Sequence, residues 1–128
     1  MRMDKLTLKA QDAVSEAQNI ATDNNHYEIQ PEHLLKALCM QDGGMLTAIS
    51  QKVGISVLDI TSEVDVAIDN LPRQTGGGPG GAVMSQSLRE VMNEAWNLAV
   101  NLKDNYLSTE HMVLSLTAKG SNKTKEIF

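Results

Sequence analysis

Residues 30–38 read QPEHLLKAL, and residues 108–116 read STEHMVLSL. Both stretches carry Glu-His at the same two places, and the apolar residues that follow lie on one face of a helix. A shift of 78 positions superposes the two stretches and also brings Thr7 onto Ser85. Because one segment recurs in the same register, we predict a tandem repeat.

A long amphipathic helix is predicted at the start of each copy. The shift aligns residues 6–38 with residues 84–116 without a gap, and Thr7 and Ser85 stand where an N-cap hydroxyl is expected. Six apolar positions, spaced by three and four, coincide in the two copies. These pairs are Ala10 and Leu88, Ala13 and Val91, Val14 and Met92, Ala17 and Ala95, Ile20 and Leu98, and Ala21 and Ala99. Each helix therefore has one face suited to burial.

Further helices follow in the first copy. Gly43-Gly44 ends the second helix, a third runs over residues 45–53 and stops at Gly54, and a fourth begins at Ser56. We predict an all-α fold of two tandem pseudo-twofold repeats with about four helices each, in which the second repeat is truncated. The predicted division of the single domain 1–128 is repeat one at 6–72, a Gly-rich linker at 73–83, and repeat two at 84–128.

The second copy is predicted to be incomplete. Pro72 stops the last helix of the first copy, and its equivalent would fall at position 150, beyond Phe128. We therefore interpret the sequence as a piece of a longer protein.

Composition narrows the range of functions. The formal net charge is −5, so a nucleic-acid partner is disfavoured. Cys39 is the single cysteine, which excludes an internal disulfide framework and fits a reducing compartment. No apolar run approaches the ~18 residues of a membrane span, and no signal region follows Met1. We expect a cytoplasmic protein with no membrane partner.

Candidate motifs for catalysis and metal binding are weak. Gly76, Gly78 and Gly81 match G-x-G-x-x-G, but the match follows a predicted helix instead of a strand, and no P-loop sequence is present. His26, His33 and His111 lack the spacing of a helical zinc site. We interpret His33 and His111 as residues that shape the first turn of a helix. The sequence predicts no metal and no catalytic group in this segment.

The motifs resemble one known family. Met3-Asp4-Lys5-Leu6-Thr7, residues 30–38, Asn70-Leu71-Pro72 and Asn105-Tyr106-Leu107-Ser108-Thr109-Glu110 resemble the Clp N-terminal (Clp repeat) domain, in its protein disaggregase branch. The resemblance implies a longer AAA+ parent that binds ATP and Mg²⁺, forms a homohexamer and rescues unfolded or aggregated polypeptides with the DnaK system. The segment itself is expected to be a monomer without a cofactor.

The resemblance also implies substrate-handling residues. Thr7, Asp104 and Glu110 match positions that disaggregases use for aggregated substrates, and their pseudo-symmetric counterparts are Ser85, His26 and Glu32. Each has a structural interpretation too. Thr7 is an N-cap, Glu110 interacts with a helix dipole, and Asp104 is a solvated carboxylate. Many relatives have an apolar residue where this chain has His111.

Two other functions stay open. The same fold serves as the adaptor-docking domain of Clp protease chaperones, which would bind a folded adaptor instead of a loose chain. A free-standing helical enzyme would need a cluster of titratable groups, and the sequence shows none that is recognisable.

Overall fold

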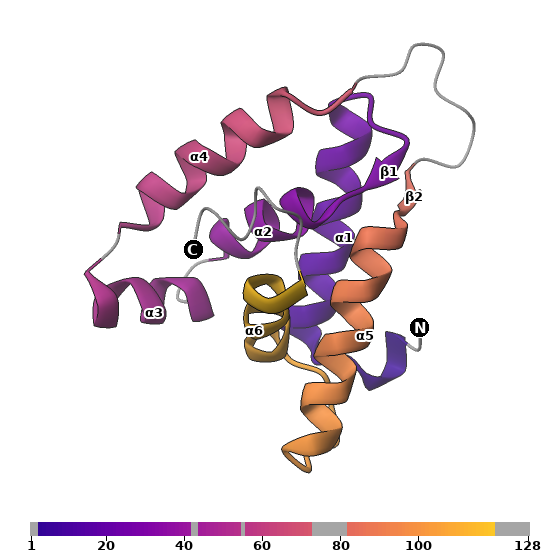
Figure 1. The fold of residues 1–128 in the computed structure, drawn as a ribbon, viewed down its shortest axis with the longest axis vertical. Helices are drawn as coiled ribbons and strands as arrows, with labels where there is room; N and C mark the ends of the chain where they lie inside the picture. Colours follow the sequence, from indigo (N-terminus) through magenta and orange to yellow (C-terminus); the bar gives the residue numbers. More distant parts are fainter. Residues whose placement is uncertain (1–2, 42–43, 55, 73–81, 120–128) are drawn as a thin grey trace.

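Helices dominate the computed structural model, which describes residues 3–41, 44–54, 56–72 and 82–119 (Figure 1). Within these ranges a 3-10 turn, Met3–Lys5, precedes six α-helices and two short strands. The helices are α1 (Leu8–Asp23), α2 (Pro31–Cys39), α3 (Met45–Val53), α4 (Val57–Asp69), α5 (Gln86–Asn101) and α6 (Thr109–Lys119). The strands are β1 (Glu28–Ile29) and β2 (Val83–Met84). The predicted all-α class is confirmed.

The helix starts follow the predicted capping residues. The Thr7 hydroxyl accepts the backbone N–H of Ala10 at 3.2 Å, and the Ser85 hydroxyl accepts that of Leu88 at 3.0 Å. The Ser56 hydroxyl likewise accepts an N–H at the start of α4. At the end of α3, Gly54 has a φ of 76°, a left-handed conformation that suits a residue without a side chain.

The core forms where two helical hairpins cross. The first hairpin is α1 with α2, and the second is α5 with α6. Helix α1 contacts α6 while α2 contacts α5 and α6, so each hairpin packs on the other (Figure 1). Ten of the side chains at this crossing are almost fully buried, and they are Ala13, Ala17, Leu34, Leu35, Leu88, Val91, Met92, Ala95, Met112 and Leu116.

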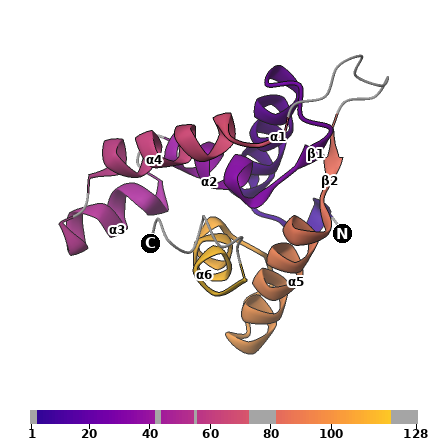
Figure 2. The ribbon, with the colours of Figure 1, turned by 45° about the horizontal axis from the view of Figure 1, so that its top comes forward.

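Helices α3 and α4 extend the first hairpin on one side. Both contact α2, and Figure 2 shows them as a layer away from α5. The Lys36 ammonium on α2 forms an ion pair with the Asp65 carboxylate on α4. No helix in the described part of the chain has the length and apolar character needed to cross a bilayer.

Two short parallel pairings tie the hairpins together, and the sequence analysis missed both. Strand β1 lies beside β2 (Figure 1) and pairs with it so that Ile29 faces Met84. An isolated parallel bridge joins Leu6 to Leu107. A shift of 78 positions carries Leu6 to Met84 and Ile29 to Leu107. The two pairings thus occupy equivalent places.

Other local contacts recur at the same spacing. The N–H of His26 binds the carbonyl of Ala21 at 2.9 Å, and that of Asp104 binds the carbonyl of Ala99 at 2.9 Å. Asn25 and Lys103, also 78 positions apart, have φ values of 61° and 62°. Three predicted features lie wholly or partly outside the described residues. They are most of the linker 73–83, Gly43 at the end of the second helix, and the end of the second repeat at residues 120–128.

Candidate functional site

The loop between α5 and α6 is organised by His111. The backbone N–H of Ser108 donates to Nδ1 of His111 at 2.9 Å, which closes the first turn of α6. Because Nδ1 accepts this bond, the ring proton lies on Nε2 and is donated to Oδ2 of Asp104 at 2.9 Å. His111 is 3% exposed, whereas the Asp104 side chain is 52% exposed. A buried ring therefore fixes the direction of an accessible carboxylate.

An open pocket of about 360 Å³ lies beside this pair. Two predicted substrate residues, Asp104 and Glu110, are both in its lining. The full lining is Asp104, Asn105, Tyr106, Ser108, Glu110 and His111. The carboxylates and Tyr106 make it acidic with one aromatic side chain.

Thr7 approaches the same loop from the other hairpin. Its backbone N–H donates to the carbonyl of Leu107 at 3.0 Å, and Leu107 returns a 2.8 Å bond to the carbonyl of Lys5. Leu107 lies within the loop, between Asp104 and Glu110 in sequence. The structure thus brings the three predicted residues to one region, although Thr7 is not among the residues that line the pocket.

The three counterpart residues occupy a different environment. Ser85 donates its N–H to the carbonyl of Ile29 at 3.1 Å, as Thr7 does to Leu107. Glu32, however, is only 6% exposed, whereas Glu110 is exposed. Of the three counterparts, only His26 is in the lining of a smaller pocket of about 120 Å³. The full lining is His26, Tyr27, Glu28, Gln30, Leu71 and Pro72. The residues that follow α4 therefore border the counterpart pocket.

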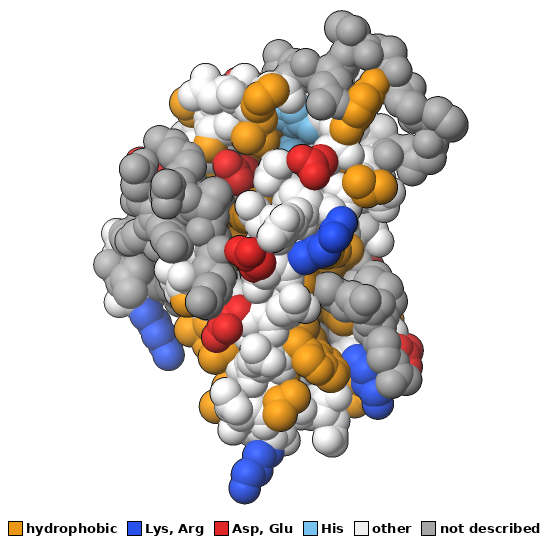
Figure 3. Space-filling model, turned by 45° about the vertical axis from the view of Figure 1, so that its right-hand side comes forward, with side chains coloured by type: hydrophobic (Ala, Val, Ile, Leu, Met, Phe, Trp, Pro, Cys, Tyr) orange, Lys and Arg blue, Asp and Glu red, His pale blue; other side chains and the backbone are white. Residues whose placement is uncertain are grey.

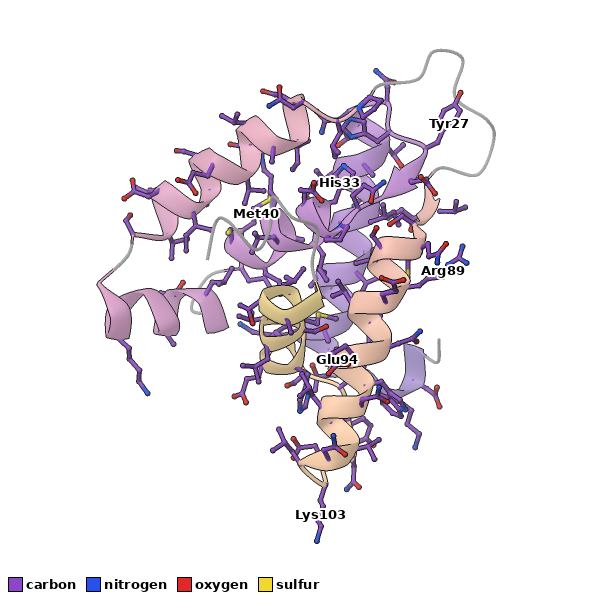
Figure 4. The ribbon with its side chains drawn as sticks, in the orientation of Figure 1. Tyr27, His33, Met40, Arg89, Glu94 and Lys103 are labelled. Atoms are coloured by element: carbon purple, nitrogen blue, oxygen red, sulfur yellow. The ribbon has the colours of Figure 1, made fainter. Side chains whose placement is uncertain are left out.

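A histidine pair takes the place of the histidine-aspartate pair in the first hairpin. The N–H of Gln30 donates to Nδ1 of His33 at 2.8 Å, and Nε2 of His33 lies 2.9 Å from Nδ1 of His26. Figure 4 shows His33 near the start of α2 and Tyr27 at the outer edge. The prediction that His33 and His111 shape the first turn of a helix is confirmed by these bonds.

Burial controls the protonation of His33. The ring is fully buried, and its pKa falls from 6.5 to about 4, chiefly because burial penalises the charged form and also because His26 is adjacent. Protonation would in addition remove the acceptor that Nδ1 offers to Gln30. Burial also raises the pKa of the Cys39 thiol, which reduces its nucleophilicity at neutral pH.

The chemistry of the α5–α6 loop suits recognition. The carboxylates of Asp104 and Glu110 can accept hydrogen bonds from a bound chain, and Tyr106 offers an aromatic surface. No group of three histidine, cysteine or acidic residues within the described ranges could hold a metal ion. The fold and this site define a helical domain whose accessible surface is suited to binding.

Comparison with known proteins identifies the family. The profile of the Clp repeat (R) N-terminal domain matches residues 5–128, so the chain belongs to that family. The similar proteins include chaperone protein ClpB of Clostridium tetani, 33% identical over 129 residues, and chaperone protein ClpB of Rhodopirellula baltica, 36% identical over 126 residues. These alignments cover 99% and 98% of this chain but 15% and 14% of the relatives. The chain corresponds to the N-domain of a Clp chaperone.

Solved structures share the fold. The Hsp104 N-terminal domain of Candida albicans has a TM-score of 0.86 at 21% identity, and the alignment covers 97% of this chain and 79% of that one. A ClpV N-domain solved in complex with a VipB peptide has a TM-score of 0.78 at 22% identity, with 98% and 78% covered.

Proposed function

We propose that this chain is the substrate-engaging N-domain of a ClpB-type chaperone, and that it captures unfolded or aggregated polypeptide through Thr7, Asp104 and Glu110. One observation carries the proposal. The Thr7–Leu107 hydrogen bond places the start of α1 against the loop whose carboxylates line one open pocket. Thr7 and the Asp104–Glu110 loop, which are distant in sequence, therefore lie next to one another in the fold.

The roles of the three residues follow from their exposure and chemistry. A captured chain has unpaired backbone N–H groups, and the accessible carboxylates of Asp104 and Glu110 are acceptors for them. His111 keeps the Asp104 carboxylate oriented before the chain arrives. Thr7 acts through the loop, because its backbone bond holds Leu107.

Binding at this pocket is expected to be weak. The lining is mostly polar and exposed, and hydrogen bonds or ion pairs at such positions contribute only about 0.5–1.5 kcal/mol each before association entropy is subtracted. Affinities in the micromolar range would allow captured chain to pass onward. In the proposed parent, that step is threading through a homohexamer that uses ATP and Mg²⁺, in the cytoplasm and together with the DnaK system.

The proposal includes the domain division. We assign residues 6–72 and 84–128 to two copies of one helical unit, joined by the Gly-rich segment 73–83. The recurring hydrogen bonds at a spacing of 78 positions support this division. The parent protein, and not this segment, would carry the ATPase activity.

Docking of a folded adaptor, as in ClpA-type or ClpC-type protease chaperones, is the alternative. A ClpV N-domain of this fold is solved with a VipB peptide bound, and binding of a peptide is consistent with either function. The two functions differ in ligand. An adaptor binds in its folded form, whereas a captured substrate binds only when unfolded.

One titration separates these functions. The labelled 128-residue chain is titrated with the unfolded and the folded form of a single test protein, and binding is read as fluorescence anisotropy. Capture of unfolded chains predicts a saturable increase with the unfolded form alone. Equal responses to both forms, or no response to either, would reject the proposal.

A further inference from the structure

One face of α5 carries an apolar centre between two basic ends. Arg89, Asn93, Trp96 and Val100 are spaced by four, three and four residues, and Lys103 follows three residues after Val100. At ~100° per residue, the four helical members lie within about 60° of one another. Trp96 is 38% exposed and Val100 is 57% exposed. We call these five residues the α5 seam.

The equivalent face of α1 shows that folding does not require this composition. A shift of 78 positions carries the α5 seam onto five uncharged polar residues of the first hairpin, namely Gln11, Ser15, Gln18, Thr22 and Asn25. Four of these five are exposed and Gln11 is half-buried. The same kind of helix at the equivalent place thus forms with uncharged polar side chains at these five positions, beside exposed Leu8 on the same face. The apolar and charged composition of the α5 seam is therefore not required to form the helix.

Lys103, just after the end of α5, has the backbone conformation of its counterpart in the first hairpin. Its φ of 62° matches the 61° of Asn25, and in both hairpins the next N–H binds the carbonyl five residues back. The position at the helix end therefore places the Lys103 side chain. Lys103 is the residue at the lower end of α5 in Figure 4, and its side chain extends away from the bundle.

The charges at the two ends indicate the chemistry of a partner. Arg89 and Lys103 form no ion pair with any residue that the structure describes, although Arg89 donates one bond to the carbonyl of Met84 at 3.1 Å. Glu94 lies about 160° around the helix from Trp96, and Figure 4 shows it on the side opposite Arg89. In Figure 3 hydrophobic side chains occupy the lower part of the view, basic groups lie near its centre and at its lower edge, and acidic groups lie above and to the left of the hydrophobic side chains.

We propose that the α5 seam docks an amphipathic helix of a partner protein, with apolar residues at its centre and carboxylates toward both ends. Trp96 and Val100 form an i, i+4 ridge of the kind that packs into the groove of another helix. Acidic groups on the partner would meet Arg89 and Lys103. This interaction goes beyond the capture of unfolded chains, because its ligand is a folded helix and its contacts lie along α5, with only Lys103 next to the capture loop.

Charge argues against a second copy of this chain as the occupant. If two α5 seams packed antiparallel, Arg89 of each copy would face Lys103 of the other. If they packed parallel, each cation would face its own equivalent. Both arrangements place like charges together, which disfavours self-association. A helix with carboxylates at both ends has neither conflict.

The test uses the 128-residue chain and a synthetic helical peptide with a leucine face at its centre and glutamates at both ends. Trp96 is the single tryptophan, so its emission reports directly on the α5 seam. We expect saturable binding with a shift of emission to shorter wavelength. Val100→Thr, which introduces the residue found at position 22, should weaken binding about fivefold. Arg89→Gln with Lys103→Asn should weaken it at least as much and reduce its salt dependence.

Matched controls keep the proposal falsifiable. Leu58→Gln changes an exposed apolar residue on α4, 77% exposed, and should leave peptide binding unchanged. The same peptide with lysines in place of glutamates should bind at least about fivefold more weakly. Equal binding of the two peptides, or unchanged binding by Val100→Thr, would overturn the proposal. Three other results would also overturn the proposal. Sedimentation could show that the free chain is a dimer, or the chain could bind anionic vesicles and not the peptide. Val100→Thr could also lose binding of unfolded chains while keeping binding of the peptide.

Discussion

Nε2 of His111 lies 2.9 Å from Oδ2 of Asp104, and the equivalent atoms of the first hairpin, Nε2 of His33 and Nδ1 of His26, are also 2.9 Å apart. One geometry therefore holds an exposed carboxylate in one hairpin and a buried imidazole in the other. The helix cap is common to both, and the accessible charge is particular to the second. Because only the second hairpin has an exposed carboxylate at this position, we place the proposed binding role of Asp104 there.

The substitution Asp104→Asn should weaken binding of unfolded polypeptide without changing the stability of the fold. The amide oxygen of the new side chain can still accept the His111 proton, and this position is half exposed, so stability should change by less than about 0.5 kcal/mol. Binding of unfolded polypeptide should weaken because the carboxylate is lost. Urea unfolding and anisotropy titration measure the two effects. Unchanged binding at unchanged stability would remove Asp104 from the site.

Thr7→Ala and Ser85→Ala form a matched pair. Both remove a hydroxyl that caps a long helix, so each should lower the free energy of unfolding by about 1 kcal/mol. Only Thr7→Ala should also weaken unfolded-chain binding, because losing this cap loosens the start of α1, from which the Thr7 backbone N–H holds Leu107 of the α5–α6 loop. Thr7→Ser should restore both properties. Equal binding by the two alanine variants would reduce Thr7 to a helix cap.

Acid should destabilise the fold through His33. Its folded-state pKa is about 4, whereas an unfolded histidine titrates near 6.5, so between these values the unfolded chain binds more protons. Stability is therefore lost as the pH falls from about 6.5 to about 4, by an amount on the order of 3 kcal/mol. Urea midpoints measured across this pH window check the prediction.

The non-titrating variant His33→Gln is the control for this pH dependence. It should be less stable than the wild type at pH 7, because the bonds to Gln30 and His26 change. Its stability should nevertheless fall less steeply between about pH 6.5 and pH 4. A slope as steep as that of the wild type would assign the pH dependence to other groups.

The crossing of the two hairpins should be the most sensitive part of the core. Leu35 on α2 is fully buried, and its truncation to alanine should cost about 2–5 kcal/mol through lost burial and a residual cavity. Leu58→Ala on α4, where the side chain is 77% exposed, is the control and should cost less than about 1 kcal/mol. Thermal unfolding of both variants tests this contrast.

Helical periodicity and capping chemistry predicted much of the fold. Thr7, Ser85 and Ser56 cap helices as expected, Pro31 begins α2, and Gly54 follows α3 in a left-handed conformation. These features depend on residues close in sequence, so a local pattern is sufficient to find them. Met92, on the predicted apolar face of the second long helix, is buried.

Contacts between distant residues were not predictable in the same way. The pairings of Ile29 with Met84 and of Leu6 with Leu107 depend on how the hairpins cross, and each involves too few residues to leave an alternating pattern. The spacing rules applied to the histidines assume one helix, whereas His26 and Asp104 lie in loops before α2 and α6. Buried Ile29 and Leu107, in connectors otherwise rich in polar residues, were the available signal.

The most direct measurement is an NMR titration of the isotope-labelled chain with an unfolded polypeptide. We expect the largest changes in amide chemical shift at Thr7, at Asp104 and Glu110, and in the loop between those two. The amide shifts of Ser85, His26 and Glu32 should change little. Shifts centred on the first-hairpin pocket, or spread evenly over the surface, would contradict the assignment of capture to the α5–α6 loop.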